Sequence, residues 1–380
     1  MRMRERGSEP EKGQGGQGGQ RELEREVLGT GRCTGCGACV NICPYQASYR
    51  DRTVTLHACD LSQGRCWAVC PRTPADLQAL RQRFGGADLT PELGPFRGLY
   101  LTRAADEGIR RRSQHGGTVS ALVALALREG WIDAAVLAGK GEGLLPRPVT
   151  VRDPEAVAGL AGSRFVVSPT IAEFNRTLGS DATRIGVVAT PCQALALAKM
   201  RTLSVTDPDR DMAKLGLVVG LFCGWALDWP KLTALLGGKT GLAAITGMDI
   251  PPSRYHTLEV YTPAGTLPVS LDEVTPCVRE ACRSCDDMTA EFSDLSVGSA
   301  RLPEGWQEAR SWNQVIVRTE RGLDLLETAC SRGVLEFRDV PEGNLERLKA
   351  ASMGKKRAAA EAAGKTAAAP APAARQGGRS

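Results

Sequence analysis

Four closely spaced cysteines near the start of the chain constrain its structure more than any other feature. They are Cys33, Cys36, Cys39 and Cys43, followed at once by Pro44. In this spacing, a tight loop presents three thiolates to one cubane cluster, and the fourth cysteine, ahead of proline, ligates a second cluster. Gly35 and Gly37 give such a loop the backbone freedom to wrap a cluster. A structural zinc site is the main alternative, but zinc sites favour two separated cysteine pairs. We therefore predict a 4Fe-4S cluster here.

Three further cysteines look like the second half of a two-cluster, ferredoxin-like motif. They are Cys59, Cys66 and Cys70, the last followed by Pro71. In the crossed pattern, one cluster takes Cys33, Cys36, Cys39 and Cys70, and the other takes Cys43, Cys59 and Cys66. The second cluster would lack a fourth thiolate. It could hold three irons, use Asp60 as a ligand, or have been lost; we favour its presence, because three cysteines have little other reason to crowd here.

The chain carries 13 cysteines in 380 residues. Residues 1–20 are charged and glycine-rich and contain no apolar stretch that could act as a signal peptide. The longest apolar run, residues 215–227, is shorter than the roughly 18 residues that a membrane-spanning helix needs. We expect a cytoplasmic protein without a membrane span, whose cysteines are metal ligands, catalytic groups or core residues.

Composition divides the chain into five parts. We expect disorder in residues 1–27, a ferredoxin-like α+β module in 28–74, a linker in 75–95, a larger α/β domain in 96–350, and a disordered basic tail in 351–380. The net charge of the whole chain is +5, and residues 354–380 carry six basic residues against Glu361 alone, which is also +5. The remainder is neutral overall, so no nucleic-acid partner is indicated.

Apolar strands alternate with helical patterns in the larger zone. Buried strands are expected at residues 134–138, 184–189 and 216–223, a hairpin at 258–261 and 267–269, a late strand at 313–318, and helices at 75–83, 118–129 and 320–330. The apolar runs read as strands that are buried on both faces, as in parallel sheets. The fold class expected is therefore α/β, preceded by the small cysteine-rich module.

A second set of cysteines lies in this larger zone. Cys192 follows one expected strand and Cys223 ends another, where α/β domains place their sites. Cys282 and Cys285 form a C-x2-C loop. Together they could supply four thiolates. They could equally be small buried core residues, and their spacing alone does not decide between the two.

Five segments of the larger zone occur in a characteristic order. They are residues 113–122 (SQHGGTVSAL), 162–165 (GSRF), 189–193 (ATPCQ), 220–223 (GLFC) and 277–285 (CVREACRSC), the last continuing to residue 298. Together they resemble the coenzyme F-420 hydrogenase/dehydrogenase beta-subunit family across most of residues 98–320. A ferredoxin-like N-terminal module is also common in that family.

The resemblance implies an FAD, a cluster close to it, and hydride exchange with the deazaflavin F-420, although some relatives act on chlorophyll-type pigments or other acceptors. Carried over position by position, it makes Cys192, Cys223, Cys282 and Cys285 the cluster ligands. Cys277 competes with these four for a place in the set. Cys330, inside an expected helix, is predicted to be a core residue.

The flavin candidate is a turn before the expected helix at 118–129. The predicted binding residues are Gly116, Gly117, Thr118 and Ser120, preceded by the arginines 110–112. Two glycines allow a backbone to approach a phosphate closely, and a helix N-terminus offers free N–H groups. With the resemblance, this turn is the predicted FAD diphosphate site. His115 stands where many relatives have serine, and Ser163, Arg164 and Ser168 form a second polar group that could contact nucleotide or substrate.

These patterns predict an iron–sulfur flavoprotein oxidoreductase. Two or three 4Fe-4S clusters would exchange electrons with a redox partner of the hydrogenase, dehydrogenase or ferredoxin type, and FAD would exchange hydride with a small molecule such as F-420. The alternative is an electron-transfer subunit without a substrate of its own. No residue fixes the direction of electron flow, and with three histidines in the chain, catalysis by side-chain acids and bases has few candidates.

Overall fold

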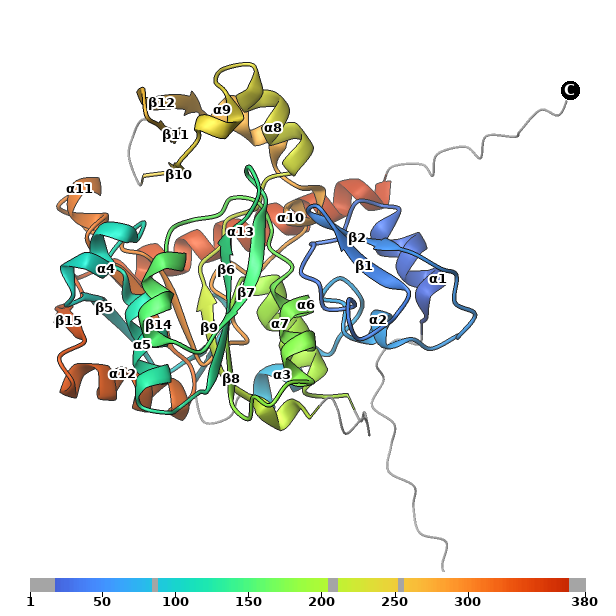
Figure 1. Cartoon of the computed structure of the whole chain (residues 1–380), viewed down its shortest axis with the longest axis horizontal. Helices are drawn as coiled ribbons and strands as arrows, with labels where there is room; N and C mark the ends of the chain where they lie inside the picture. Colours follow the sequence, from blue (N-terminus) through green and yellow to red (C-terminus); the bar gives the residue numbers. More distant parts are fainter. Residues whose placement is uncertain (1–17, 84–87, 204–210, 252–255, 369–380) are drawn as a thin grey trace, which may run out of the picture.

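The computed structural model describes residues 18–83, 88–203, 211–251 and 256–368. Its centre is an eight-stranded mixed sheet in the order β15-β5-β14-β13-β9-β8-β6-β7. A small cysteine-rich module lies at one end of this sheet, and a three-stranded subdomain lies beyond one of its edges (Figure 1). The predicted fold class, α/β with a small N-terminal module, is confirmed.

The module contains a short helix, a hairpin and a second short helix. These are α1 (Gln20–Leu23), continued as a wider helical turn to Leu28, then β1 (Gln46–Tyr49), β2 (Arg52–Thr55) and α2 (Arg65–Ala68). The expectation of disorder up to residue 27 is wrong for residues 18–27. Leu23 and Val27, four residues apart on one face, are fully buried against Trp67, and this burial orders the segment. Residues 1–17 lie outside the described residues.

The predicted linker is partly regular. It forms α3 (Leu77–Arg83), close to the helix expected at 75–83, followed after a gap in the described residues by the antiparallel pair β3 (Asp88–Thr90) and β4 (Gly94–Phe96). Leu80 of α3 is buried in the same core cluster as Ile42 of the module and Phe174 of the large domain. The linker therefore packs against both parts that it joins.

The central sheet has a parallel middle and antiparallel edges. Its strands are β5 (Gly98–Ala104), β6 (Ala134–Lys140), β7 (Pro146–Val151), β8 (Ile185–Ala189), β9 (Leu215–Leu221), β13 (Leu295–Ser299), β14 (Asn313–Val317) and β15 (Leu335–Arg338). Strands β6, β8, β9 and β13 pair in parallel, whereas β7, β14, β5 and β15 pair antiparallel. The three predicted apolar strands, β6, β8 and β9, are thus three of the four inner parallel ones.

Alternate residues of the inner strands bury on opposite faces of the sheet. In β6, Ala134 and Val136 join a core with α6 (Thr170–Leu178) and α7 (Pro191–Met200). Ala135 and Leu137 join a second core with α5 (Thr118–Arg128) and α12 (Glu320–Ser331). Both faces are covered by helices, which explains why these strands read as continuous apolar runs instead of alternating ones.

A subdomain with its own core is inserted between β9 and β13. It contains α8 (Trp229–Gly237), β10 (Gly247–Asp249), β11 (Thr257–Thr262), β12 (Gly265–Ser270), α9 (Leu271–Val274) and α10 (Glu280–Arg283). Strands β11 and β12 are the predicted hairpin. Its core is closed by Leu232, Leu258 and Val269, all fully buried.

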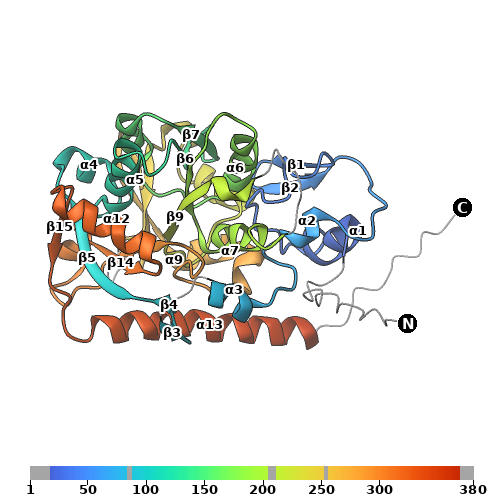
Figure 2. The ribbon, with the colours of Figure 1, turned by 90° about the horizontal axis from the view of Figure 1, so that it is seen from below.

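The C-terminal segment forms one long helix, α13 (Asn344–Ala368). The large domain also contains two short helices, α4 (Glu107–Arg112) and α11 (Trp306–Ala309). Figure 2 shows α13 running along one side of the molecule toward the module. The expected disordered tail is therefore wrong for residues 351–368, and residues 369–380 lie outside the described part. Alanine and lysine favour helix, and Leu348 and Ser352 are fully buried, so the segment is ordered by packing as well as by propensity. In the described residues, no helix combines the length and apolar character needed to cross a bilayer.

Candidate iron–sulfur and flavin sites

The module brings together the four cysteines predicted to hold the first cluster, which are Cys33, Cys36, Cys39 and Cys70. The loop that carries Cys33, Cys36 and Cys39 turns through Gly35 and Gly37, whose φ angles are +67° and +81°, in the left-handed region that favours glycine. Partial burial raises the pKa of the Cys39 thiol well above its ordinary value, and the neighbouring sulfurs of Cys36, Cys70 and Cys33 raise it further. The crossed grouping expected from the spacing is therefore present in space. We call these four residues the proximal set.

The second predicted set has three cysteines. Burial raises the pKa of Cys66 to about 11, and the nearby sulfurs of Cys43 and Cys59 add to the rise. Asp60, considered as a fourth ligand, is an exposed residue next to Cys59. We call Cys43, Cys59 and Cys66 the distal set. The structure brings its three thiols together, as the spacing predicts.

The large domain assembles a third set from the ends of two parallel strands and a loop. Cys192 lies in the first turn of α7, after β8, and Cys223 follows β9. Partial burial raises the pKa of Cys192, and the sulfurs of Cys285 and Cys282 raise it further. Partial burial also raises the pKa of Cys223. Lys355 opposes this rise, and the sulfurs of Cys282, Cys192 and Cys285 add to it. We call Cys192, Cys223, Cys282 and Cys285 the large-domain set.

Two other cysteines stand apart from these sets. Cys277 is buried in the subdomain core with Val278 and Leu227. Burial raises the pKa of its thiol, and the charged groups that act on it are Lys231 and Asp228, not the large-domain sulfurs. Cys330 was expected in the core but is exposed. It directly follows Ala329, the last residue of the buried stripe of α12, and one further residue turns it about 100° away from the core.

The chemistry of the gathered side chains fits iron–sulfur clusters. All eleven cysteines of the three sets are free thiols, and thiolates are soft ligands that hold iron–sulfur cores. Among the described residues, no three His, Cys, Asp or Glu side chains stand at the spacing of a single metal ion. A cubane is larger than one ion, so its ligands stand further apart. Burial favours the protonated thiol, whereas the ligand that binds a cluster is the thiolate. Cluster binding would therefore release a proton from each ligating cysteine.

The proximal and large-domain sets adjoin each other. Burial raises the pKa of the Cys36 thiol, and the next contributors are the sulfurs of Cys192 and Cys70. Arg72, two residues after Cys70, donates to the backbone carbonyl of Ser284 at 3.2 Å and to that of Ala281. A guanidinium from the module thus binds the loop that carries Cys282 and Cys285. The distal, proximal and large-domain sets therefore follow one another across the junction.

Buried hydrogen bonds fix the module to the large domain. Arg279 forms a buried ion pair with Asp51, in the turn between β1 and β2, and donates to the Cys33 carbonyl at 2.9 Å. The Asn175 side-chain amide donates to the carbonyls of Ala38 at 3.1 Å and Val40 at 2.7 Å. These contacts hold the cysteine loop against the sheet, and none was predicted from the sequence.

Lys199 is another residue near the cysteines that was not predicted from the sequence. It is buried, and its Nζ donates to the Cys70 carbonyl at 2.6 Å and to the Thr73 hydroxyl at 2.7 Å. Burial lowers the pKa of this lysine to about 8, although the sulfurs of Cys70 and Cys36 oppose the change. A lysine within the otherwise apolar run of α7 (LALAKM) was the available signal.

The turn predicted to bind flavin is largely engaged in packing. Gly117 has a φ of +81° and precedes the first turn of α5. Thr118 is fully buried; its hydroxyl bonds the Thr102 hydroxyl at 2.8 Å, and its N–H donates to Asn313 Oδ1 at 3.2 Å. A Cβ on Gly116 would come within 2.9 Å of the same Asn313 oxygen. Both glycines are thus required by contacts inside the protein, and Ser120 is buried two residues after Thr118 in α5.

Polar atoms without partners lie beside this turn. His115 Nε2 bonds the Ser299 hydroxyl at 3.0 Å, while its Nδ1 is buried with no hydrogen-bond partner among the described residues. The same holds for Arg164 Nε and Ser168 Oγ. The loop of Arg164 approaches the Arg112 carbonyl, and the Ser168 carbonyl accepts from Gln193, next to Cys192. Unpartnered groups therefore extend from the His115 turn toward the large-domain set, as a site for a bound polar molecule requires.

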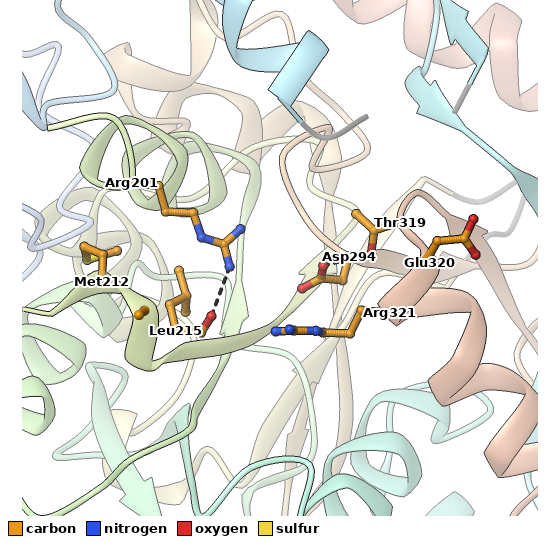
Figure 3. Close-up of a pocket in the computed structure, with 8 residues that line it drawn as sticks. Arg201, Met212, Leu215, Asp294, Thr319, Glu320 and Arg321 are labelled. Atoms are coloured by element: carbon orange, nitrogen blue, oxygen red, sulfur yellow. Dashed lines mark hydrogen bonds between the residues drawn. The ribbon is translucent and has the colours of Figure 1, made fainter. Parts of the chain in front are cut away.

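A cavity of about 660 Å³ lies at the opposite edge of the sheet. Figure 3 shows Arg201, Asp294 and Arg321 in its wall, with Arg201 donating to the Leu215 carbonyl at 3.1 Å. Leu215 begins β9, whereas Cys223 follows the end of that strand. None of the predicted site residues lines this cavity, so its position does not match the flavin site.

Comparisons with known proteins agree with this arrangement. Models of the coenzyme F-420 hydrogenase/dehydrogenase beta subunit match at residues 99–173 (N-term) and 182–343 (C terminus), and a 4Fe-4S binding domain matches at 27–49. The coenzyme F-420 hydrogenase subunit beta of Methanothermobacter thermautotrophicus is 30% identical over 272 residues, which cover 68% of this chain and 92% of that protein. The chain belongs to the coenzyme F-420 hydrogenase/dehydrogenase beta-subunit family.

Two further comparisons cover more of this chain. The coenzyme F-420-dependent sulfite reductase of Methanocaldococcus jannaschii is 26% identical over 316 residues, 79% of this chain and 46% of that protein. A chain of the F-420-reducing nickel–iron hydrogenase complex of Methanosarcina barkeri superposes with a TM-score of 0.65 at 26% identity, covering 74% of this chain and 95% of that one. The predicted family and the predicted 4Fe-4S module are therefore confirmed, and the chain is a member of an oxidoreductase family.

Proposed function

We propose that this chain is an iron–sulfur flavoprotein that carries electrons between a redox partner protein and a hydride-accepting small molecule, with coenzyme F-420 as the leading candidate. The observation that carries the proposal is the succession of three cysteine sets. The Cys192 sulfur lies within electrostatic reach of the Cys36 thiol across the junction, so a relay through the module would continue into the large domain. The relatives named for F-420 chemistry match 68% and 79% of this chain.

The proposed cofactors are two or three clusters and one FAD. The proximal and large-domain sets would each hold a 4Fe-4S cluster, and the distal set would hold a cluster on three thiolates. When bound, FAD supplies the exchange between hydride transfer and one-electron steps. The unpartnered atoms of His115, Arg164 and Ser168 would contact the flavin or the substrate, and the N-terminus of α5 remains the proposed diphosphate position.

The partner would donate or accept electrons at the module, because the module carries two cysteine sets and the flavin turn belongs to the large domain. A hydrogenase, a dehydrogenase or a ferredoxin-type protein would serve, and we expect this exchange in the cytoplasm. The second candidate function is an electron-transfer subunit without its own substrate. The internal engagement of Thr118 and the two glycines favours that alternative, because it leaves fewer groups free for a phosphate.

The test is F-420-linked electron transfer by the purified, anaerobically reconstituted chain with a viologen dye as the one-electron partner. We expect F-420 turnover that depends on FAD, and loss of most of that turnover in Cys192→Ser. Cys330→Ser is the matched control, because Cys330 is an exposed thiol outside all three sets. A chain that binds no flavin but still passes electrons between dyes would support the subunit alternative, and equal turnover in Cys192→Ser would contradict the relay.

A further inference from the structure

Helix α13 covers the large-domain set from outside the part of the chain that matches the family. The family match ends at residue 343, and α13 begins at Asn344. The helix packs against α10, which carries Cys282. It is held there by Ser352, whose hydroxyl donates to the Glu92 carbonyl at 2.6 Å, and by Lys356, which pairs at 2.7 Å with buried Glu291.

One side chain of α13 reaches the large-domain set itself. Lys355 Nζ donates to the backbone carbonyl of Cys223 at 2.7 Å. The charged or ionisable groups that act on its ammonium are the sulfurs of Cys285, Cys223 and Cys282 and the carboxyl of Asp287. Three of the four large-domain sulfurs therefore lie within electrostatic reach of this lysine.

The surroundings of Lys355 differ from those of Lys356, which anchors the helix through an ion pair. Its neighbour Lys356 has a carboxylate at 2.7 Å, whereas the hydrogen bond of Lys355 ends on a neutral carbonyl. An ammonium withdrawn from water needs opposite charge nearby to offset the loss of hydration. Thiolates that ligate a cluster supply such charge, and Asp287 adds to it. Arg72 faces Cys192 from the module, and Arg279 acts on Cys282, so Lys355 is one of three cations around the set.

We propose that α13 places Lys355 beside the large-domain cluster to raise its reduction potential; this rests on the cluster proposed above at Cys192, Cys223, Cys282 and Cys285. Reduction of a cluster held by these cysteines would take one electron from a reduced neighbour in the relay, which would be oxidised in turn, and Lys355 would keep its proton. A fixed positive charge stabilises the more negative, reduced cluster relative to the oxidised one. Lys355 thereby favours residence of the electron next to the flavin turn.

The test compares four variants of the full-length, anaerobically prepared chain by potentiometric titration with electron paramagnetic resonance. Lys355→Met removes charge and hydrogen bond, Lys355→Gln keeps an N–H donor, and Lys355→Arg keeps the charge. Arg357→Met is the control, because Arg357 is exposed two residues further along the helix. The large-domain signal is the one that disappears in Cys285→Ser. Potentials are compared at one pH.

We expect Lys355→Met and Lys355→Gln to lower the midpoint potential of that signal by about 59 mV or more, a tenfold change in a one-electron equilibrium. Lys355→Arg and Arg357→Met should match the unmutated chain. An unchanged potential in both neutral variants, or an equal fall in Lys355→Arg, would overturn the inference while leaving the proposed cluster intact. Loss of the cluster from both neutral variants but not from Lys355→Arg would assign Lys355 to cluster retention and also overturn it. If no signal depends on Cys285, the proposed function itself fails.

Discussion

At the scale of single residues, His115 shows how burial sets the chemistry of the turn before α5. Partial burial lowers its pKa below the ordinary value of 6.5; Asp249 opposes this change and Arg310 adds to it. The folded protein therefore holds a neutral imidazole at pH 7, with one nitrogen on Ser299 and the other available to a bound molecule. A neutral histidine can donate or accept a hydrogen bond without bringing a charge to a flavin.

This lowered pKa predicts a specific pH dependence of stability. Between the folded pKa and about 6.5, the unfolded chain binds more protons than the folded chain, so stability is lost as pH falls through that window. His115→Asn removes this titration. We expect the advantage of the unmutated chain in apparent melting temperature, relative to His115→Asn, to shrink between pH 8 and pH 5.5. His57→Asn, at an exposed histidine, is the control; parallel pH profiles for all three proteins would rule the prediction out.

Substitution of Gly117 tests whether the glycine pair is needed for the backbone conformation of the turn or for binding of a phosphate. Its φ of +81° costs an L-residue about 1–2 kcal/mol, and a Cβ there would lie 3.0 Å from Ile109 Cγ2. We expect Gly117→Ala to lower the free energy of unfolding by at least about 1 kcal/mol. Gly237→Ala is the control, because a Cβ at that helical position meets nothing within 4 Å. Urea unfolding measures the change; full stability with loss of bound FAD would instead show that the glycine serves the cofactor.

At the scale of elements, one of the contacts that join the module to the sheet is a buried ion pair. The Asp51 and Arg279 side chains are 1% and 6% exposed, and Asp51 also accepts from the Trp229 N–H at 3.0 Å. Removing one partner of such a pair leaves an uncompensated buried charge, which typically costs about 3–5 kcal/mol. The cost here would fall on the hairpin that supports the Cys33 loop.

We therefore expect Asp51→Ala to lower the free energy of unfolding of the module by about 3–5 kcal/mol. Asp181→Ala is the matched control, because it removes an ion pair with Arg152 whose side chains are 81% and 49% exposed, and such solvent-screened pairs contribute little to stability. The measurement is urea unfolding combined with limited proteolysis, in which the module should be cleaved earlier in Asp51→Ala than in the control. Equal behaviour of the two variants would show that the pair does not hold the junction.

The sequence could predict those elements whose cause is local. Cysteine spacing fixes the loop of Cys33 to Cys39, and runs of apolar residues fix the inner strands, so both were predicted. The helical segments at 20–28 and 344–368 were missed, because they have few large apolar residues and their order comes from a few distant contacts such as Leu23 on Trp67. Likewise, the internal bonds of Thr118 are made by Thr102 and Asn313, which belong to strands β5 and β14 and cannot be read from the turn itself.

At the scale of the whole molecule, three cysteine sets drawn from distant stretches of chain meet at one end of the sheet. The sets adjoin because Asp51, Arg72 and Asn175 bind across the junction, and the large domain also carries the unpartnered atom of His115. The described fold thus has a module at which a partner could exchange electrons and a separate turn at which a small molecule could react. This separation is what an electron relay requires.

The most direct test of this account is the measurement of iron, acid-labile sulfide and extracted flavin per chain after anaerobic purification. Two or three clusters predict roughly 8 to 12 iron atoms, a similar amount of sulfide, and about one FAD. Either of two results would contradict the account: zinc in place of iron, or only about four irons and no flavin.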